Sequence, residues 1–475
     1  MTTSSPLGRR VAVIGGGIAG LAAAHALATA DRPAQVTLFE AGDDLGGKIR
    51  TTPFADHPGI DEGADAFLAR VPWATNLARE VGLGDTLVSP TAGHAAVWMD
   101  GLHRIPAGLL LGMPTDVLAL GRSRLLSIRG KARAAIEPML PRTDLGADSL
   151  GSYVRHRFGN EVHERLVDPL VGSIYAADTD RFSLAAVPQI ADLAGSARSV
   201  LLAARRRPAA PEGPVFYTPA AGMGGFVTAV AAAFADAGGT TCAGTAVTSL
   251  ERSGTGWLVA ADQSGAGQFD AGQFDAGQFD AVVLACPAAA TAALLRRSAL
   301  AADAVPAIGG ITTADVALVT LAVPAQDWPR ALHGMSGYLV PKPQQRLVTA
   351  VSFGSQKWSH WASTQHQVLR ISLGRDGLPV LHLDDATLLA AAVDEVSAQL
   401  GFTLQPTQTR LTRWAGAFPQ YRPHHHDRVT ATQRELPAGI SIAGASYHGI
   451  GIPACVRSGQ LAAQSALQHL DSMAD

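Results

Sequence analysis

The sequence predicts an α/β protein with one parallel-sheet domain that is interrupted by a helical and a mixed-sheet insertion. A strand, a glycine-rich turn, a helix and a second strand follow one another in residues 9–40. The same α/β character returns in residues 215–300 and 440–470. The chain has 475 residues, of which 47% are hydrophobic and 16% charged, so it can bury the cores of two or three structural units.

The first unit is predicted from two apolar segments, residues 9–14 and 35–40, that are typical of buried parallel strands. An alanine-rich helix is expected between them, at residues 18–30. The apolar run of residues 11–30 could also be a signal peptide or a membrane anchor. Three consecutive glycines and the lack of a small-residue cleavage site favour a βαβ unit.

The middle of the chain divides into three segments with different patterns of predicted helices and strands. Residues 90–210 are expected to be mostly helical, and a basic stretch lies within them at Arg122, Arg124, Arg129, Lys131 and Arg133. Residues 215–300 predict a helix and several strands, with the repeat Ala-Gly-Gln-Phe-Asp three times from Ala266, which indicates a lengthened surface hairpin. Residues 310–410 alternate strands and loops before a helix at 385–400, and a last strand and helix follow.

Charge and cysteine usage narrow the class of protein. The formal net charge of −3 includes no basic excess that would indicate a nucleic-acid partner. Cys242, Cys286 and Cys455 are too few and too scattered for a disulfide framework, so a cytoplasmic location is expected. Three adjacent histidines, His424 to His426, point in different directions and lack a second ligand cluster, so no metal site is predicted.

A dinucleotide site is predicted at the first glycine-rich turn. Gly15, Gly17 and Gly20 follow a strand and open a helix, the context in which these glycines permit a tight turn, close approach of a pyrophosphate and close helix packing. The helix N-terminus offers free N–H groups to phosphate. Glu40 ends the second strand, where an acid accepts hydrogen bonds from a ribose. The domain is therefore expected to be Rossmann-like.

Two further glycine-rich segments extend this prediction. Residues 45–51 contain adjacent glycines followed by Lys48 and Arg50, which suit phosphate. Residues 443–453 contain three glycines between a strand and a helix, which suits a phosphate or the edge of a flavin ring. We predict three parts: an FAD-binding domain (1–70, 215–305 and 410–475), a helical domain (90–214) and a substrate-binding domain (71–89 and 306–409).

At these residues the chain resembles the flavin amine oxidase superfamily, and within it the protoporphyrinogen and coproporphyrinogen oxidases, mostly of Gram-positive type. The matching segments span nearly the whole chain: residues 15–20, 45–51, 61–68, 168–178, 337–341, 357–358, 413–414, 419–421 with His425, and 444–453. The chain departs from the family pattern at Asp61, Ala64 and Ala454. Residues 445–453 contain no cysteine, so the resemblance implies non-covalent FAD.

The resemblance implies cofactor contacts from Gly15, Gly16, Gly17, Ile18, Ala19, Gly20, Glu40, Gly47, Lys48, Gly63, Ala64, Asp65, Ala66, Val247, Trp414, Gly449, Ile450, Gly451 and Ile452. It implies oxidation of coproporphyrinogen III to coproporphyrin III in haem synthesis, with dioxygen reduced to hydrogen peroxide. Protoporphyrinogen IX is the alternative substrate. An amine oxidase or a carotenoid desaturase is a more remote alternative. A non-catalytic, flavin-free protein that binds lipidated partners disagrees with the intact glycine motif, Glu40 and the C-terminal glycine loop.

Substrate carboxylates need cations, because arginine binds a carboxylate through two parallel hydrogen bonds. The expected substrate contacts are Arg70, Tyr175, Lys357, Arg370 and Arg375, and no catalytic residue is expected beyond the flavin. The basic stretch of residues 122–133 favours a solvated helix face over peripheral contact with an anionic membrane. Transient docking of another haem-pathway enzyme is compatible with this function.

Overall fold

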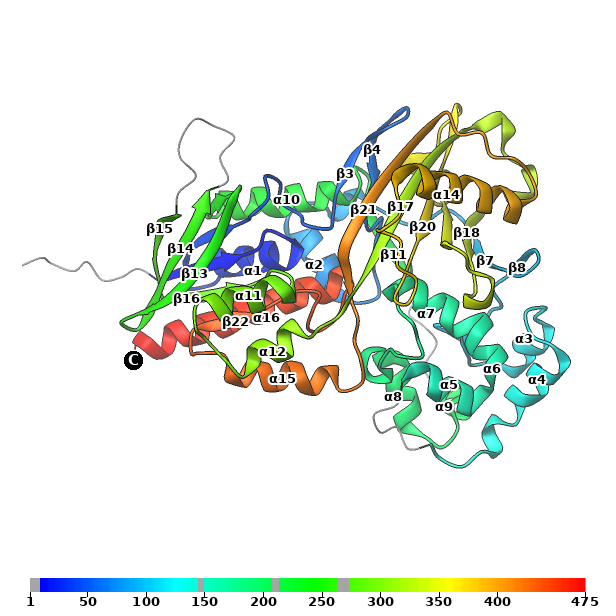
Figure 1. Cartoon of the computed structure of the whole chain (residues 1–475), viewed down its shortest axis with the longest axis horizontal. Helices are drawn as coiled ribbons and strands as arrows, with labels where there is room; N and C mark the ends of the chain where they lie inside the picture. Colours follow the sequence, from blue (N-terminus) through cyan, green and yellow to red (C-terminus); the bar gives the residue numbers. More distant parts are fainter. Residues whose placement is uncertain (1–8, 144–148, 207–212, 264–272, 475) are drawn as a thin grey trace, which may run out of the picture.

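The computed structural model describes residues 9–143, 149–206, 213–263 and 273–474, and Figure 1 shows their arrangement. A five-stranded parallel sheet has the order β12-β2-β1-β16-β22. Its strands are β1 (Arg10–Ile14), β2 (Gln35–Phe39), β12 (Thr240–Cys242), β16 (Ala281–Leu284) and β22 (Ile440–Ile442). Strands from the two ends and the middle of the chain thus form one sheet, as the sequence predicts.

Both faces of this sheet are covered. One face packs against α1 (Ile18–Ala28), α10 (Met223–Asp236) and α16 (Ile452–Ala474). The other face packs against a layer formed by β13 (Thr245–Ser253), β14 (Gly256–Gln263), β15 (Gln273–Phe279), α11 (Ala288–Arg297), α12 (Ala304–Gly309) and α15 (His425–Glu435). Strands buried on two faces explain the uninterrupted apolar runs of β1 and β16.

The sequence repeat lies partly in this layer. β15 contains the third copy up to Phe279 and pairs antiparallel with β14, so the expected hairpin strands are present. The first copy and the start of the second lie outside the described residues.

A seven-stranded mixed sheet has the order β21-β17-β20-β19-β18-β7-β8. Its strands are β7 (His94–Trp98), β8 (Leu102–Arg104), β17 (Thr313–Pro324), β18 (Met335–Leu339), β19 (Val348–Phe353), β20 (His366–Leu373) and β21 (Gln408–Pro419), and α14 (Asp385–Leu400) packs on it. Residues 94–104 were expected in the mostly helical segment. β7 joins the sheet because β18, which is distant in sequence, supplies its partner, and β8 pairs in turn with β7.

A helical part lies beside this sheet (Figure 1). After two short strands, β9 (Leu109–Leu110) and β10 (Met113–Pro114), it contains α3 (Val117–Arg122), α4 (Ile128–Ala135), α5 (Leu150–Phe158), α6 (Asn160–Val162), the π-helix η3 (His163–Val167), α7 (Asp168–Tyr175), α8 (Pro188–Ser196) and α9 (Val200–Arg205). These helices share their own apolar core.

Shorter elements join the parts. The hairpin of β3 (Thr51–Phe54) and β4 (His57–Asp61) leads from the parallel sheet toward β20 and β21. β5 (Phe67–Leu68), β11 (Phe216–Pro219) and β6 (Leu87–Val88) form a small antiparallel sheet beside α2 (Pro72–Glu80). No helix within the described ranges is both long and apolar enough to cross a membrane.

Candidate cofactor and substrate site

The glycine turn between β1 and α1 leaves space for a ligand at one position only. A Cβ at Gly20 would lie 1.9 Å from the Gly15 carbonyl oxygen, so Gly20 allows α1 to pack against the strand. A Cβ at Gly17 would meet nothing within 4 Å. Gly17 is the N-cap of α1 and has no side-chain cap, so no side chain occupies the first N–H groups of the helix at this end. These features fit a pyrophosphate.

Glu40 organises the turn from the end of β2. Its carboxylate accepts hydrogen bonds from the backbone N–H of Gly16 at 2.6 Å and of Gly42 at 2.8 Å. The backbone of Glu40 also pairs with Cys242 and Thr245, which places Val247 on the adjoining strand β13. The acid is thus fixed beside the glycine turn.

The second glycine segment packs directly on the first. Gly46 donates its N–H to the Gly16 carbonyl oxygen at 2.8 Å. Lys48 reaches the end of β21, where its ammonium donates to the Ala417 carbonyl oxygen at 2.8 Å. Burial lowers the pKa of Lys48. A cation held by carbonyl oxygens retains attraction for an anion, as a phosphate contact requires.

Gly63 and Trp414 bring the inserted sheet to the same place. A Cβ at Gly63 would lie 2.3 Å from the Lys48 carbonyl oxygen, so only glycine permits this approach. The Trp414 indole donates to the Glu62 carbonyl oxygen at 2.7 Å. Ala64 is exposed and Ala66 packs on the Trp358 cluster. Residues expected to contact the cofactor from three segments therefore lie together.

The C-terminal glycine loop is held by Tyr421. Its hydroxyl donates to the Ala445 carbonyl oxygen and accepts the N–H of Gly449 at 2.9 Å. Gly449 has a φ of +133°, and Ile450 and Gly451 lead into α16, which begins at Ile452. Tyr421 was expected only as part of a segment that resembles the family. The strand and its bend after Pro419 were the signals that could have marked it as a support for the loop.

Two of the expected substrate cations meet at one carboxylate. Asp65 accepts from Lys357 at 2.9 Å and from the Trp358 indole at 3.0 Å, and it lies 3.3 Å from Arg370. Burial would raise the pKa of Asp65, but Lys357 and Arg370 outweigh that effect and hold it well below its usual range. Arg370 also donates to the Gly63 carbonyl oxygen. Lys357, Arg370 and Asp65 together carry one net positive charge, and Asp61 interacts electrostatically with Arg370 and Asp65.

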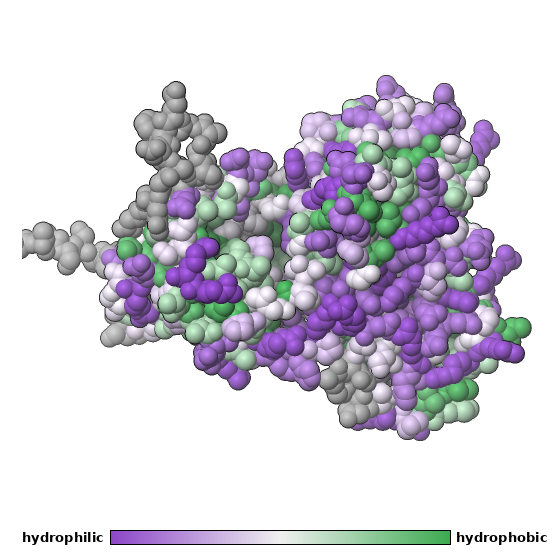
Figure 2. Space-filling view, in the orientation of Figure 1, coloured by the Kyte–Doolittle hydropathy of each residue, from purple (hydrophilic) through white to green (hydrophobic). Residues whose placement is uncertain are grey.

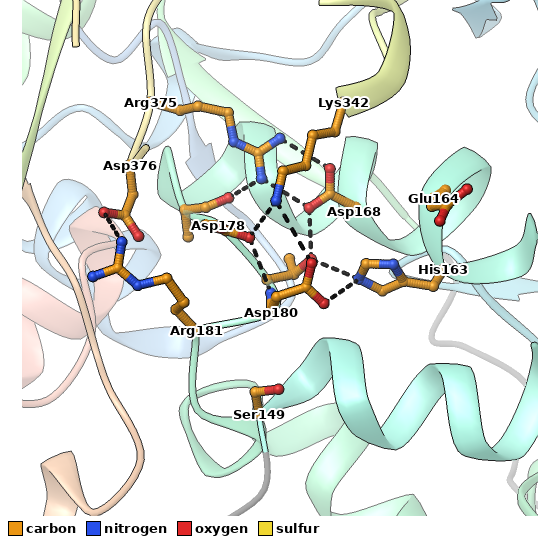
Figure 3. A network of polar contacts seen from close by, with 12 residues as sticks. Ser149, His163, Glu164, Asp168, Asp178, Asp180, Arg181, Lys342, Arg375 and Asp376 are labelled. Carbon is orange, nitrogen blue, oxygen red and sulfur yellow. Dashed lines mark hydrogen bonds and ion pairs between the residues drawn. The ribbon is translucent and has the colours of Figure 1, made fainter. Parts of the chain in front are cut away.

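The other expected substrate residues lie apart from that cluster. Arg370 comes from β20 and Lys357 from the short helix α13 (Gly354–Lys357) that follows β19, whereas Arg70 is exposed in the turn before α2. Tyr175 is half-buried at the end of α7, with its ring 4.8 Å from that of Phe182. Arg375 forms a buried ion pair with Asp168 of the helical part (Figure 3). The structure thus gives Arg375 an internal partner in place of a free position in a pocket.

His425, one of the three adjacent histidines, is buried and lies 3.1 Å from the Tyr447 carbonyl oxygen, while His424 and His426 flank it at the start of α15. Among the residues that the structure describes, no group of three or more His, Cys, Asp or Glu side chains could hold a metal ion.

The fold and these contacts define a class: an α/β dinucleotide-binding protein whose cofactor segments meet an inserted sheet. The chain belongs to the flavin containing amine oxidoreductase family, whose sequence profile matches residues 18–467. It is therefore a flavin-dependent oxidoreductase.

Full-length relatives are similar to the chain. It is 30% identical to coproporphyrinogen III oxidase of Bacillus subtilis over 98% of the chain and 99% of the relative. It is 34% identical to coproporphyrinogen III oxidase of Mycobacterium tuberculosis, with 98% of both chains covered. A solved structure from Exiguobacterium, classed as a protoporphyrinogen oxidase, superimposes with a TM-score of 0.83 at 29% identity, covering 98% of this chain and 99% of that one.

Proposed function

We propose that this flavoprotein binds FAD non-covalently and oxidises coproporphyrinogen III to coproporphyrin III in haem synthesis. The observation that carries the proposal is the end-to-end similarity to coproporphyrinogen III oxidases of Bacillus and Mycobacterium. Each hydrogen pair that leaves the macrocycle would reduce one molecule of dioxygen to hydrogen peroxide. Protoporphyrinogen IX is the second candidate, favoured by the classification of the Exiguobacterium structure.

The cofactor would be held along its length by the glycine-rich segments. The N-terminus of α1 and Gly17 would receive the pyrophosphate, Glu40 the ribose, and the loop of Gly449 to Ile452 the flavin end. When bound, FAD would supply the redox chemistry by accepting hydride and returning electrons to dioxygen. Residues 443–453 offer no cysteine for a covalent link.

The chain itself would bind and orient the macrocycle. Lys357 and Arg370 exceed the charge of Asp65 by one, so they would attract a propionate while Asp65 keeps both cations in place. Arg70 and Tyr175 are proposed as further contacts. Because the product is aromatic, orientation and exclusion of water suffice without a protein nucleophile. The three-part division of the chain is retained as a proposal.

The experiment compares anaerobically prepared coproporphyrinogen III and protoporphyrinogen IX in air, with porphyrin fluorescence and peroxide followed together. We expect faster turnover of coproporphyrinogen. Preference for protoporphyrinogen would select the second candidate, and inactivity on both, with flavin bound, would contradict the proposal and turn attention to amines. Precipitation with acid is expected to release the flavin into the supernatant, whereas flavin retained by the pellet would show a covalent link.

We also propose that the protein is cytoplasmic and that its helical part contacts an anionic membrane peripherally. Leu118, Ile128 and Met139 are 73%, 85% and 81% exposed on α3, α4 and the adjoining turn η2 (Glu137–Met139). Arg122, Arg124 and Arg129 are exposed beside them. Figure 2 shows apolar surface gathered on this part of the molecule. Apolar side chains with flanking cations are typical of interfacial binding.

A haem-pathway enzyme is proposed as a transient partner.

A further inference from the structure

A network of charged side chains links the helical part to the mixed sheet (Figure 3). At its centre, the Arg375 guanidinium donates to both oxygens of Asp168, at 2.9 and 2.8 Å. The Asp168 and Arg375 side chains are 1% and 4% exposed, so the pair is isolated from solvent. Around it, Lys342 contacts Asp178 and Asp180, and Arg181 contacts Asp376.

The surroundings of the pair are shaped for it. Thr179 donates to Asp168 at 2.5 Å, and its hydroxyl lies 2.8 Å from His163 Nε2. A Cβ at Gly172 would lie 2.9 Å from the Arg375 guanidinium, so glycine at this point of α7 makes room for it. The carboxylate oxygens of Asp168 thus accept hydrogen bonds from three protein donors, two on Arg375 and one on Thr179.

Arg375 also holds the turn that follows α7. Its guanidinium donates to the Ala177 carbonyl oxygen, and the N–H of the next residue, Asp376, donates to the Ala176 carbonyl oxygen at 2.8 Å. Ala176 has a φ of +45°, a left-handed conformation that a residue other than glycine adopts when its surroundings fix it. Tyr175, the proposed substrate contact, immediately precedes this turn.

The same turn is joined to the cofactor segments. Gln420, which is 1% exposed, donates to the Tyr175 carbonyl oxygen at 3.1 Å. Its neighbour Tyr421 fixes Ala445 and Gly449 in the C-terminal glycine loop. Arg422 forms a two-bond pair with Asp376, at 2.7 and 2.9 Å. The end of β21 therefore connects the Tyr175 turn with the loop proposed to hold the flavin.

We infer that Asp168 and Arg375 are positioning residues, which set the Tyr175 side chain at the correct distance from the cofactor loop for porphyrinogen binding. Arg375 thus acts through Tyr175 and not by contact with a propionate. This inference rests on the proposed porphyrinogen oxidase function. It predicts that loss of the pair and loss of Tyr175 impair the same binding step.

The test is a double-mutant cycle on the full-length flavin-loaded enzyme, with KM and kcat measured for coproporphyrinogen III. Tyr175→Ala and the neutral pair D168N/R375Q are each expected to raise KM about tenfold with kcat within about twofold, and the combined triple variant is expected to exceed the pair by no more than about twofold. Independent effects that multiply in the triple variant, or a neutral pair with the KM of the wild type, would overturn the inference.

Further variants separate the alternatives. Asp168→Asn alone is expected to raise KM, because it weakens the ion pair that positions Tyr175. If Arg375 instead bound a propionate directly, the same change would release its guanidinium for the substrate. An unchanged or lowered KM would therefore overturn the inference. Thr179→Val removes one hydrogen bond to Asp168 and no charge. If the pair variants fail to fold, this milder variant tests the inference, and it is expected to raise KM about threefold.

The matched control is E137Q/R157Q, which neutralises another buried ion pair of the helical part, with side chains 0% and 1% exposed. It is expected to lower the melting temperature and leave KM within about twofold. An equal rise of KM in this control would show a general loss of structure and overturn the positioning role. A wild-type enzyme that oxidises neither porphyrinogen would instead contradict the proposed function itself.

Discussion

Glu40 shows how far a single residue can be placed from sequence. Its spacing from the glycine motif predicted an acid beside the cofactor, and the structure puts its carboxylate on the N–H groups of Gly16 and Gly42. The partners themselves were not predictable, because they depend on how the two turns fold over the sheet.

We predict that Glu40→Ala raises the dissociation constant of FAD at least about tenfold, because a charged acceptor of two backbone N–H groups and of the proposed ribose is lost. Titration of apoprotein with FAD, followed by quenching of flavin fluorescence, measures the change. Asp43→Asn, an exposed acid on the same turn, is the control and should bind FAD as the wild type does. Equal affinities for the two variants would exclude the role given to Glu40.

Asp61 is fully buried, and burial raises its pKa to about 6 from an ordinary value of 3.8, although hydrogen bonds from Thr51 and Met223 act in the opposite direction. Between these values the unfolded chain has lost a proton that the folded protein retains. The free energy of unfolding therefore falls as the pH rises through this window, and the loss persists above it.

We predict that Asp61→Asn, which stays neutral, lacks this fall. Between pH 5 and pH 8 the wild type should lose about 1–2 kcal/mol relative to the variant. Urea denaturation of both proteins at the two pH values measures the difference, and comparison with the wild type cancels the titration of all other groups. A constant difference across the range would show that Asp61 is ionised throughout.

The cation cluster marks the limit of prediction at this scale. Lys357 and Arg370 were expected near the substrate from residue type and family position, but their common partner Asp65 was expected only as a cofactor contact. Arg375 was expected as a substrate contact and lies in an ion pair with Asp168. Sequence shows which cations exist, whereas the choice between a ligand and an internal carboxylate is made by tertiary packing.

At the scale of elements, the strand–turn–helix unit at the N-terminus separates packing from binding. Gly20 is required by the approach of α1 to the Gly15 carbonyl oxygen, while Gly17 faces open space with an ordinary φ of −68°. The two glycines of this motif are therefore needed for different reasons: Gly20 for helix packing and Gly17 for ligand space.

We predict that Gly17→Ala leaves the melting temperature of the apoprotein unchanged within about 2 °C but weakens FAD binding at least about tenfold, because the new methyl group occupies the space left for the pyrophosphate. Gly20→Ala should lower the melting temperature of the apoprotein itself, because its methyl group meets backbone. Thermal denaturation without flavin and FAD titration distinguish the two. A destabilised Gly17→Ala apoprotein would contradict this division.

Elements with a strong local pattern were predictable, and those completed by distant partners were not. The buried strand β1 and the helix α14 match their expected segments, residues 9–14 and 385–400, within a few residues. β7 and β8 are short, and the pairing of β7 with β18 becomes visible only when residues 335–339 are brought beside it. For such strands the decisive contacts are not encoded within their own neighbourhood.

At the scale of the whole molecule, the exposed apolar side chains of the helical part together predict binding to a membrane surface. We predict that the protein floats with vesicles containing anionic lipid and not with neutral vesicles at physiological salt. Ile128→Asp combined with Met139→Asp should abolish flotation while porphyrinogen turnover in detergent-free solution stays within about twofold. Val215→Asp, a change at an exposed site outside the helical part, is the control. Flotation that survives the double change would place the contact elsewhere.

The strand order of the parallel sheet has a consequence for biosynthesis. β1 leaves the ribosome before the other four strands of this sheet, yet it lies at the centre of the sheet between β2 and β16. α1 packs so closely on α16 that a Cβ at Gly459 would lie 2.1 Å from the Ala19 carbonyl oxygen. The nascent chain must therefore keep the apolar faces of β1 and α1 open through most of translation. The loop before α16, which we propose to hold the flavin, is synthesised after the inserted sheet, so a chain stalled within that sheet would lack this part of the proposed cofactor site.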